Sequence, residues 1–162
     1  HRTIKGTAHI IEAVEQLQKE GLPLELVMME KRPNHEVRAM IKSCDLIIDQ
    51  LIVGWYAMFA IEAMALQKPV ICYQREDLQD LYKIAGLLDK NEEIPLINAT
   101  PLTIKDTLRD LYGNQEDLYQ RGLAGRQYVL KHHSLEAIAK VFGKIVAEIL
   151  PESDNNKTHK HS

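Results

Sequence analysis

Two cations and a glycine stand directly before the first helical pattern of the chain. The segment Arg2-Thr3-Ile4-Lys5-Gly6-Thr7 leads into a run whose apolar residues recur at helical spacing. The first amide groups of a helix lack internal acceptors, and the helix dipole favours an anion at that end. Lys5 would supply a point charge and Gly6 a close backbone approach, so the segment fits a phosphate group. A solvated turn is the alternative interpretation.

A single carboxylate interrupts the most apolar part of the chain. Glu62 is the sole charged residue between Asp49 and Lys68, in a segment that otherwise suits a buried helix. An ionised carboxylate in such surroundings is costly unless it is hydrogen-bonded or opens to a cleft. The hydroxyl groups of a sugar or a ribose would satisfy it. The alternative is that Glu62 lies on one wet stripe of an amphipathic helix.

Three further candidates precede Glu62. Asp49 follows a short apolar run that we predict to be a strand, and a side chain at a strand's carboxyl end faces the predicted cleft. Trp55 and Tyr56 stand where strand passes into helix, and they would form either aromatic walls of a pocket or part of the core.

Helices and short buried strands alternate along the first hundred residues. Gly21 stands where a helix of this length needs a left-handed residue, and Thr7 is the predicted N-cap. We predict helices over Thr7–Glu20, His35–Ser43, the later part of Gly54–Leu66, and Asp77–Ala85. We predict strands at Leu24–Met29, Leu46–Ile48, Pro69–Tyr73 and, at an edge, Ile94–Ile97.

This alternation predicts an α/β fold, a Rossmann-like doubly wound parallel sheet with helices on both faces. Ligands of such sheets gather outside the carboxyl ends of the strands. The expected site therefore comes from the loops at His1–Gly6, Glu30–Asn34, Asp49–Tyr56 and Gln74–Asp77.

The last third of the chain is predicted to be helical. Thr100 with Pro101, Asn114 and Ser134 are start signals for three helices. Residues 1–150 are expected to form one domain, and Pro151–Ser162 a polar, disordered tail.

Composition excludes several classes of protein. Twenty basic and 23 acidic residues give a net charge of -3, which provides no general nucleic-acid surface. The longest stretch without charge, Gln50–Ile61, is too short to span a bilayer. The two cysteines, Cys44 and Cys72, lack metal-ligand spacing and suit a reducing cytoplasm, so no metal site is expected.

Three segments together resemble a known family. Lys5-Gly6-Thr7 opens the first helix, and Glu62-Ala63-Met64-Ala65 comes shortly before Lys68-Pro69-Val70-Ile71. This pattern is similar to the C-terminal, donor-binding half of a GT-B glycosyltransferase of the family-four (group-one) type, over roughly Arg2–Ile149.

The resemblance implies a function and roles for several residues. Lys5 would contact the diphosphate of a nucleotide-diphosphate sugar, Glu62 would hold the ribose hydroxyls, and Arg2 is the nearest candidate for a second basic residue. Transfer would retain the anomeric configuration and need no cofactor. The acceptor, a saccharide or a lipid-linked molecule, and any catalytic base would belong to an N-terminal domain of the same protein. A cytoplasmic location follows, with peripheral membrane contact through that other half left open.

Two departures from the family pattern leave the sugar open. Gly54 stands eight residues before Glu62, where the family commonly has another glutamate. Asp49, Gln50, Tyr56 or backbone amides near Gly54 would then contact the sugar. A glycine-rich turn that many members carry after the Pro-Val-Ile strand is also replaced by Gln74-Arg75-Glu76-Asp77.

Two other functions stay open at this point. One is a non-catalytic, regulatory nucleotide-binding module, and the other is half of a sugar-nucleotide epimerase. We expect that the chain is a piece of a longer protein. On its own, the chain should bind a nucleotide or nucleotide sugar and catalyse no transfer.

Overall fold

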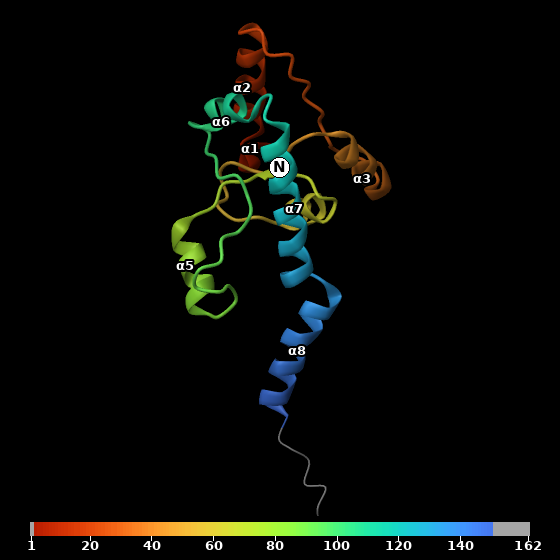
Figure 1. The fold of residues 1–162 in the computed structure, drawn as a ribbon, viewed down its shortest axis with the longest axis vertical. Coiled ribbons are helices and arrows are strands. Elements are labelled where there is room, and N and C mark those ends of the chain that lie inside the picture. Colours follow the sequence, from red (N-terminus) through yellow and green to blue (C-terminus); the bar gives the residue numbers. More distant parts are fainter. Residues whose placement is uncertain (1, 151–162) are drawn as a thin grey trace, which may run out of the picture.

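The structure is a computed structural model that describes residues 2–150, so the tail predicted for Pro151–Ser162 lies outside the described residues. Helices make up most of the described structure, and two short strands stand between them in the chain (Figure 1). The helices are α1 (Arg2–Lys5), α2 (Thr7–Lys19), α3 (Asn34–Ser43), α4 (Met58–Ala65), α5 (Glu76–Ile84), α6 (Ile104–Leu111), α7 (Gln115–His132) and α8 (Leu135–Ile149).

Two short strands form a parallel sheet. In β1 (Ile47–Ile48) and β2 (Val70–Ile71), Ile47 lies opposite Val70 and Ile48 lies opposite Ile71. Ile97 adds a single parallel bridge to Ile71. Its amide donates to the Val70 carbonyl at 2.8 Å, and its carbonyl accepts from the Cys72 amide at 3.0 Å.

The predicted doubly wound, Rossmann-like sheet is wrong. The structure is 57% helix, and its named strands comprise two residues each. Leu24–Met29 belongs to no helix and no named strand in the described chain, and its Val27 and Met28 are 37% and 38% exposed. An apolar run predicts a buried strand only when other elements cover both of its faces, and this segment lacks that cover.

The strands separate two apolar cores. Ile47 and Val70 pack in one core with residues of α4 and α7. Ile71 packs in the other with residues of α2 and α6, and Ile48 packs against that second core. The alternation of side chains along a strand explains why neighbouring residues enter different cores.

Most of the predicted helices are present, with small changes at their ends. The first runs over Thr7–Lys19, and Gly21 follows it with a φ of 96°. Its N-cap is Gly6 rather than the predicted Thr7. The predicted caps Asn114 and Ser134 are confirmed, since each side chain accepts a hydrogen bond from an amide in the first turn of its helix.

The last helix, α8, runs away from the rest of the molecule (Figure 1). Several of its apolar side chains are exposed, among them Leu135 at 89% and Phe142 at 63%. None of the described helices is both long and apolar enough to cross a membrane.

Two glycines allow α7 to pack closely on the end of α4. A Cβ at Gly122 would lie 2.3 Å from the carbonyl oxygen of Gln67, which follows α4. A Cβ at Gly125 would lie 3.0 Å from Met64 Cγ. Because α4 carries Glu62, the packing of α7 also helps to determine where that carboxylate lies.

Gly122→Ala should lower the free energy of unfolding by about 1–3 kcal/mol, since the added methyl group meets a backbone atom that cannot yield locally. Gly143→Ala in α8 is the matched control, because nothing lies within 4 Å of its added Cβ. The control should leave stability unchanged or raise it by up to about 1 kcal/mol. Urea unfolding followed by circular dichroism measures both. Equal effects would contradict the close packing of α7 on α4.

Candidate functional site

Lys5 and Asp49 form an ion pair across 44 residues of sequence. The Lys5 ammonium donates to Asp49 Oδ1 at 2.7 Å. The backbone fixes this approach, because the Leu51 amide donates to the Lys5 carbonyl at 3.0 Å. The predicted loop around Lys5 is instead the short helix α1, which Gly6 separates from α2.

The two members of the pair differ in their exposure to water. The Asp49 side chain is fully buried, and that of Lys5 is 46% exposed. Asp49 Oδ1 accepts from Lys5, whereas Oδ2 is buried and has no hydrogen-bond partner in the described part of the chain. Lys5 therefore presents a positive charge to solvent, with a buried negative charge directly behind it.

The ammonium of Lys5 also lies against α4. Its Nζ is 5.3 Å from the centre of the Phe59 ring, within range of a cation–π interaction. Glu62 is three residues further along the same helix, and residues three apart are neighbours on a helix surface. Lys5 therefore lies beside the helix that carries Glu62.

Glu62 is only partly buried. Its neighbours Ala60, Ala63 and Met64 are the buried residues of α4, while Glu62 is partly buried. Both interpretations of Glu62, a carboxylate that opens to a cleft and one on the wet side of an amphipathic helix, agree with this intermediate burial. The same exposure leaves the carboxylate accessible to a ligand.

Gly6 has the left-handed backbone that joins α1 to α2. Its φ is 76°, and an added Cβ would lie 3.3 Å from side-chain atoms of both Leu51 and Ile52. As the N-cap of α2 it offers no side chain, so the first turn of that helix has no side-chain cap. Arg2 begins α1, directly before this junction.

The loop after Asp49 is organised by Gln50, which is 3% exposed. Its Oε1 accepts from the amides of Ile52 at 2.9 Å and Val53 at 2.7 Å. Its Nε2 donates to the carbonyls of Trp55 and Tyr73, each at 3.0 Å. The sequence analysis predicts Gln50 only as a contact for the sugar, and it does not predict this role in holding the loop. The available signal was a polar residue within an otherwise apolar run.

Gly54 lies where a glutamate could not simply replace it. Its φ is 89°, and an added Cβ would lie 2.5 Å from Cγ and Cδ of Arg75. The Gly54 carbonyl accepts from the Arg75 amide at 2.9 Å, and its own amide points to Gln50 Oε1 at 3.4 Å. Because Gln50 takes up the amides of this loop, they are not free to bind a sugar.

Tyr56 is a core residue, and Trp55 packs partly buried against the same core. The Tyr56 hydroxyl lies 2.9 Å from that of Tyr128 and 3.1 Å from His133 Nε2. Burial and the Tyr128 hydrogen bond raise the pKa of Tyr56 well above its usual value, while burial and the nearby His132 lower that of His133. Tyr56 is therefore part of the core, whereas Trp55 packs against the core and stays partly exposed.

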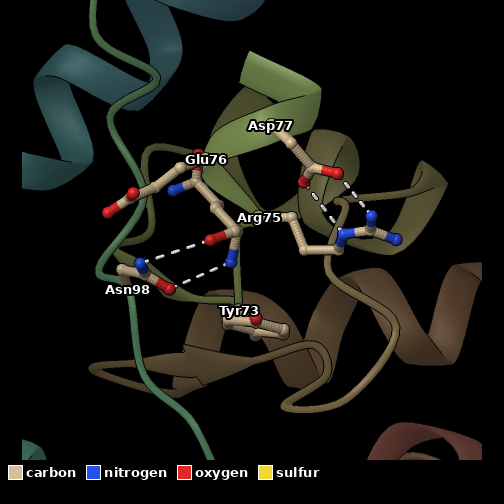
Figure 2. A pocket seen from close by; sticks show the side chains of 6 residues that line it. Tyr73, Arg75, Glu76, Asp77 and Asn98 are labelled. Atoms are coloured by element: carbon tan, nitrogen blue, oxygen red, sulfur yellow. Dashed lines mark hydrogen bonds and ion pairs between the residues drawn. The ribbon is translucent and has the colours of Figure 1, made fainter. Parts of the chain in front are cut away.

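A polar pocket of about 310 Å³ opens after β2 (Figure 2). Arg75 and Asp77, two of its lining residues, form an ion pair with each other, while Asn98 pairs with the backbone of Gln74 through two hydrogen bonds. Gln74 is 4% exposed, and its Oε1 has no hydrogen-bond partner within residues 2–150. The residues that line the pocket are Tyr73, Gln74, Arg75, Glu76, Asp77 and Asn98.

Three of the four predicted loops come together at this edge. Lys5 pairs with Asp49, and Gly54 contacts Arg75. The Tyr73 amide donates to the Gln50 carbonyl at 2.9 Å, which joins the loops after β1 and β2. The fourth loop leads into α3, which stands apart from α5 (Figure 1).

No family model, curated protein or solved structure matches the chain. Within the described residues, no group of three or more histidine, cysteine, aspartate or glutamate side chains could hold a metal ion. The chemistry of the site itself is what indicates a ligand. The site has the accessible ammonium of Lys5 beside Phe59, the accessible carboxylate of Glu62 one helical turn after Phe59, and the polar pocket after β2.

Gln50→Glu should lower the free energy of unfolding by about 1–3 kcal/mol, because the new carboxylate can accept from the loop amides but cannot donate to the two carbonyls. Gln115→Glu, an exposed change at the start of α7, is the control. Urea unfolding at pH 7 measures both. A Gln50→Glu protein as stable as the control protein would contradict the role of Gln50 in the loop.

Lys5→Ala should cost about 2 kcal/mol of stability, because it leaves the buried Asp49 carboxylate without its cation. Adding Asp49→Asn to Lys5→Ala should restore most of that loss, since the isosteric amide carries no charge. A double-mutant cycle in urea tests the pair. Strictly additive effects would show that the two side chains do not interact energetically.

Proposed function

We propose that the chain binds a nucleotide-diphosphate sugar and serves as the donor-binding part of a retaining glycosyltransferase. The observation that carries the proposal is the position of the Lys5 ammonium against Phe59, one turn of α4 from Glu62. A cation beside the helix that carries a carboxylate suits a ligand with a phosphate group next to a ribose. The proposal does not require the doubly wound sheet that the structure excludes.

Lys5 and the start of α2 would bind the diphosphate. The Lys5 side chain is accessible, and α2 begins without a side-chain cap. A helix N-terminus with a nearby ammonium is favourable for a phosphate group, through the amide groups and the helix dipole. Gly6 itself is buried beneath the side chains of Leu51 and Ile52, so a ligand would reach this junction from the side of Lys5.

Glu62 would accept hydrogen bonds from the ribose hydroxyls. A carboxylate accepts through both oxygens, so it matches two adjacent hydroxyl groups. The partial exposure of Glu62 supports this role, because a ribose can reach the carboxylate without first breaking a buried contact.

The sugar would occupy the pocket after β2. That pocket adjoins Gly54 through Arg75, and it offers a guanidinium, carboxylates and an amide within one small space. Its volume of about 310 Å³ is at the lower end of the range for small-ligand sites. A pocket built from Arg75, Asp77 and Asn98 differs chemically from one built around a glutamate at position 54. We therefore expect this chain to prefer a different sugar from the family members that carry that glutamate.

In transfer, this chain would stabilise the departing diphosphate. As the bond to the sugar breaks, negative charge grows on the diphosphate, and the ammonium of Lys5 would interact with it more strongly than in the ground state. The acceptor hydroxyl and the group that removes its proton would come from the other part of the protein. The chain alone should therefore bind nucleotide and transfer nothing.

Calorimetry with UDP, GDP and ADP tests the proposal. At least one should bind, and Lys5→Ala combined with Asp49→Asn, which preserves folding, should weaken it by roughly 10- to 100-fold because a charge-assisted contact is lost. Glu62→Gln should weaken the nucleoside diphosphates but not inorganic pyrophosphate, which has no ribose. Lys19→Ala and Glu15→Gln, at exposed positions of α2, are the controls.

Two results would reject the proposal. If none of the three nucleotides binds, the chain is not a donor-binding unit. If a nucleotide binds equally well to all variants, the site lies elsewhere and a regulatory nucleotide-binding module becomes the better interpretation. Exchange of a sugar's configuration without transfer to an acceptor would instead favour the epimerase.

A further inference from the structure

The Lys5 ammonium, which we propose binds phosphate, already pairs with a carboxylate of the protein itself, that of Asp49. Lys5 Nζ lies 2.7 Å from Asp49 Oδ1, a hydrogen-bond distance. A phosphate oxygen bound to Lys5 would approach the same positive charge. The carboxylate and the ligand therefore interact with one cation and repel each other.

Asp49 has little else to compensate its charge. Its side chain is fully buried, and its Oδ2 has no hydrogen-bond partner among residues 2–150. A carboxylate removed from water depends strongly on the few partners that it has. The attraction between Asp49 and Lys5 is therefore stronger than that of an exposed pair, and a ligand has to act against it.

We propose that Asp49 is an internal competitor for the diphosphate site. Its carboxylate holds Lys5 in place when no ligand is bound and lowers the affinity of Lys5 for phosphoryl groups. The biological role rests on the proposed function: a carboxylate behind the site would favour release of the nucleoside diphosphate once the sugar has been transferred. The competition itself concerns only phosphate and can be tested without a nucleotide.

A positioning role for Asp49 predicts the opposite effect. If the carboxylate mainly orients Lys5 for the ligand, removing its charge loosens the ammonium and weakens binding. If it competes, removing the charge strengthens binding, and the gain grows with the charge of the ligand. Asp49→Asn separates the two, because asparagine keeps the shape and an acceptor oxygen while removing the charge.

The experiment is calorimetry on the full chain with inorganic pyrophosphate, orthophosphate and an uncharged nucleoside. Asp49→Asn should bind pyrophosphate about tenfold more tightly than the wild type, orthophosphate with a smaller gain, and the nucleoside without change. Asp110→Asn, at an exposed position of α6, changes the net charge equally and should change none of these affinities. Weaker or unchanged pyrophosphate binding by Asp49→Asn, or no binding by either protein, would overturn the proposal.

A measurement on the wild type keeps the test independent of folding in the variant. In a chain labelled with ¹³C at the aspartate carboxyl carbons, pyrophosphate should shift the Asp49 signal, because Lys5 is drawn from Oδ1 or shared. The Asp110 signal should stay in place. An Asp49 signal that does not move at saturating pyrophosphate would overturn the proposal.

The two proposals can fail separately. If Asp49→Asn tightens pyrophosphate but no nucleoside diphosphate binds better than pyrophosphate, the competition stands and the donor-binding function fails. If a nucleoside diphosphate binds in a Glu62-dependent way and Asp49→Asn does not tighten it, the function stands and the competition fails.

Discussion

A buried negative charge beside a half-exposed positive one is the interaction on which the site depends. Parallel pairing of β1 with β2 fixes Asp49, since its amide donates to the Ile71 carbonyl at 3.0 Å. The ammonium of Lys5 then ties the start of α2 to the end of β1. Because an unpaired buried carboxylate is costly, folding itself brings this cation to the edge where the loops meet.

The loop between β1 and α4 is held by one amide side chain rather than by secondary structure. Gln50 accepts from backbone amides with its oxygen and donates to backbone carbonyls with its nitrogen. Such a residue satisfies buried polar groups that a short loop would otherwise leave unpaired. Neighbouring residues thus have different roles: Gln50 holds the loop in shape, while Asp49 pairs with the accessible ammonium of Lys5.

Local signals in the sequence predicted the helices well and the sheet poorly. Asn114, Ser134 and Gly21 act through neighbouring backbone, so their roles follow from a few adjacent residues. A strand depends on distant partners instead. The apolar run at Leu24–Met29 carries the composition of a buried strand, but no partner in the described chain pairs with it as a named strand.

The same distinction applies to the site. Residue type was enough to select Lys5 and Glu62, and a rule about strand ends selected Asp49. Their relation was not predictable, because the contact between Lys5 and Asp49 spans 44 residues and its strength depends on burial that only packing determines. The aromatic residues illustrate the reverse: Tyr56 is at a site-like position in sequence, yet its hydroxyl is bound within the core.

The left-handed backbone at Gly54 has a consequence for attempts to alter sugar choice. Arg75 occupies the volume next to that residue, and the chain turns there in a conformation that side chains rarely adopt. A carboxylate cannot be grafted at this point by one exchange of residue. Arg75 would have to be shortened first and the turn rebuilt, so these two positions, 21 apart in the sequence, form a single unit for design and for evolution.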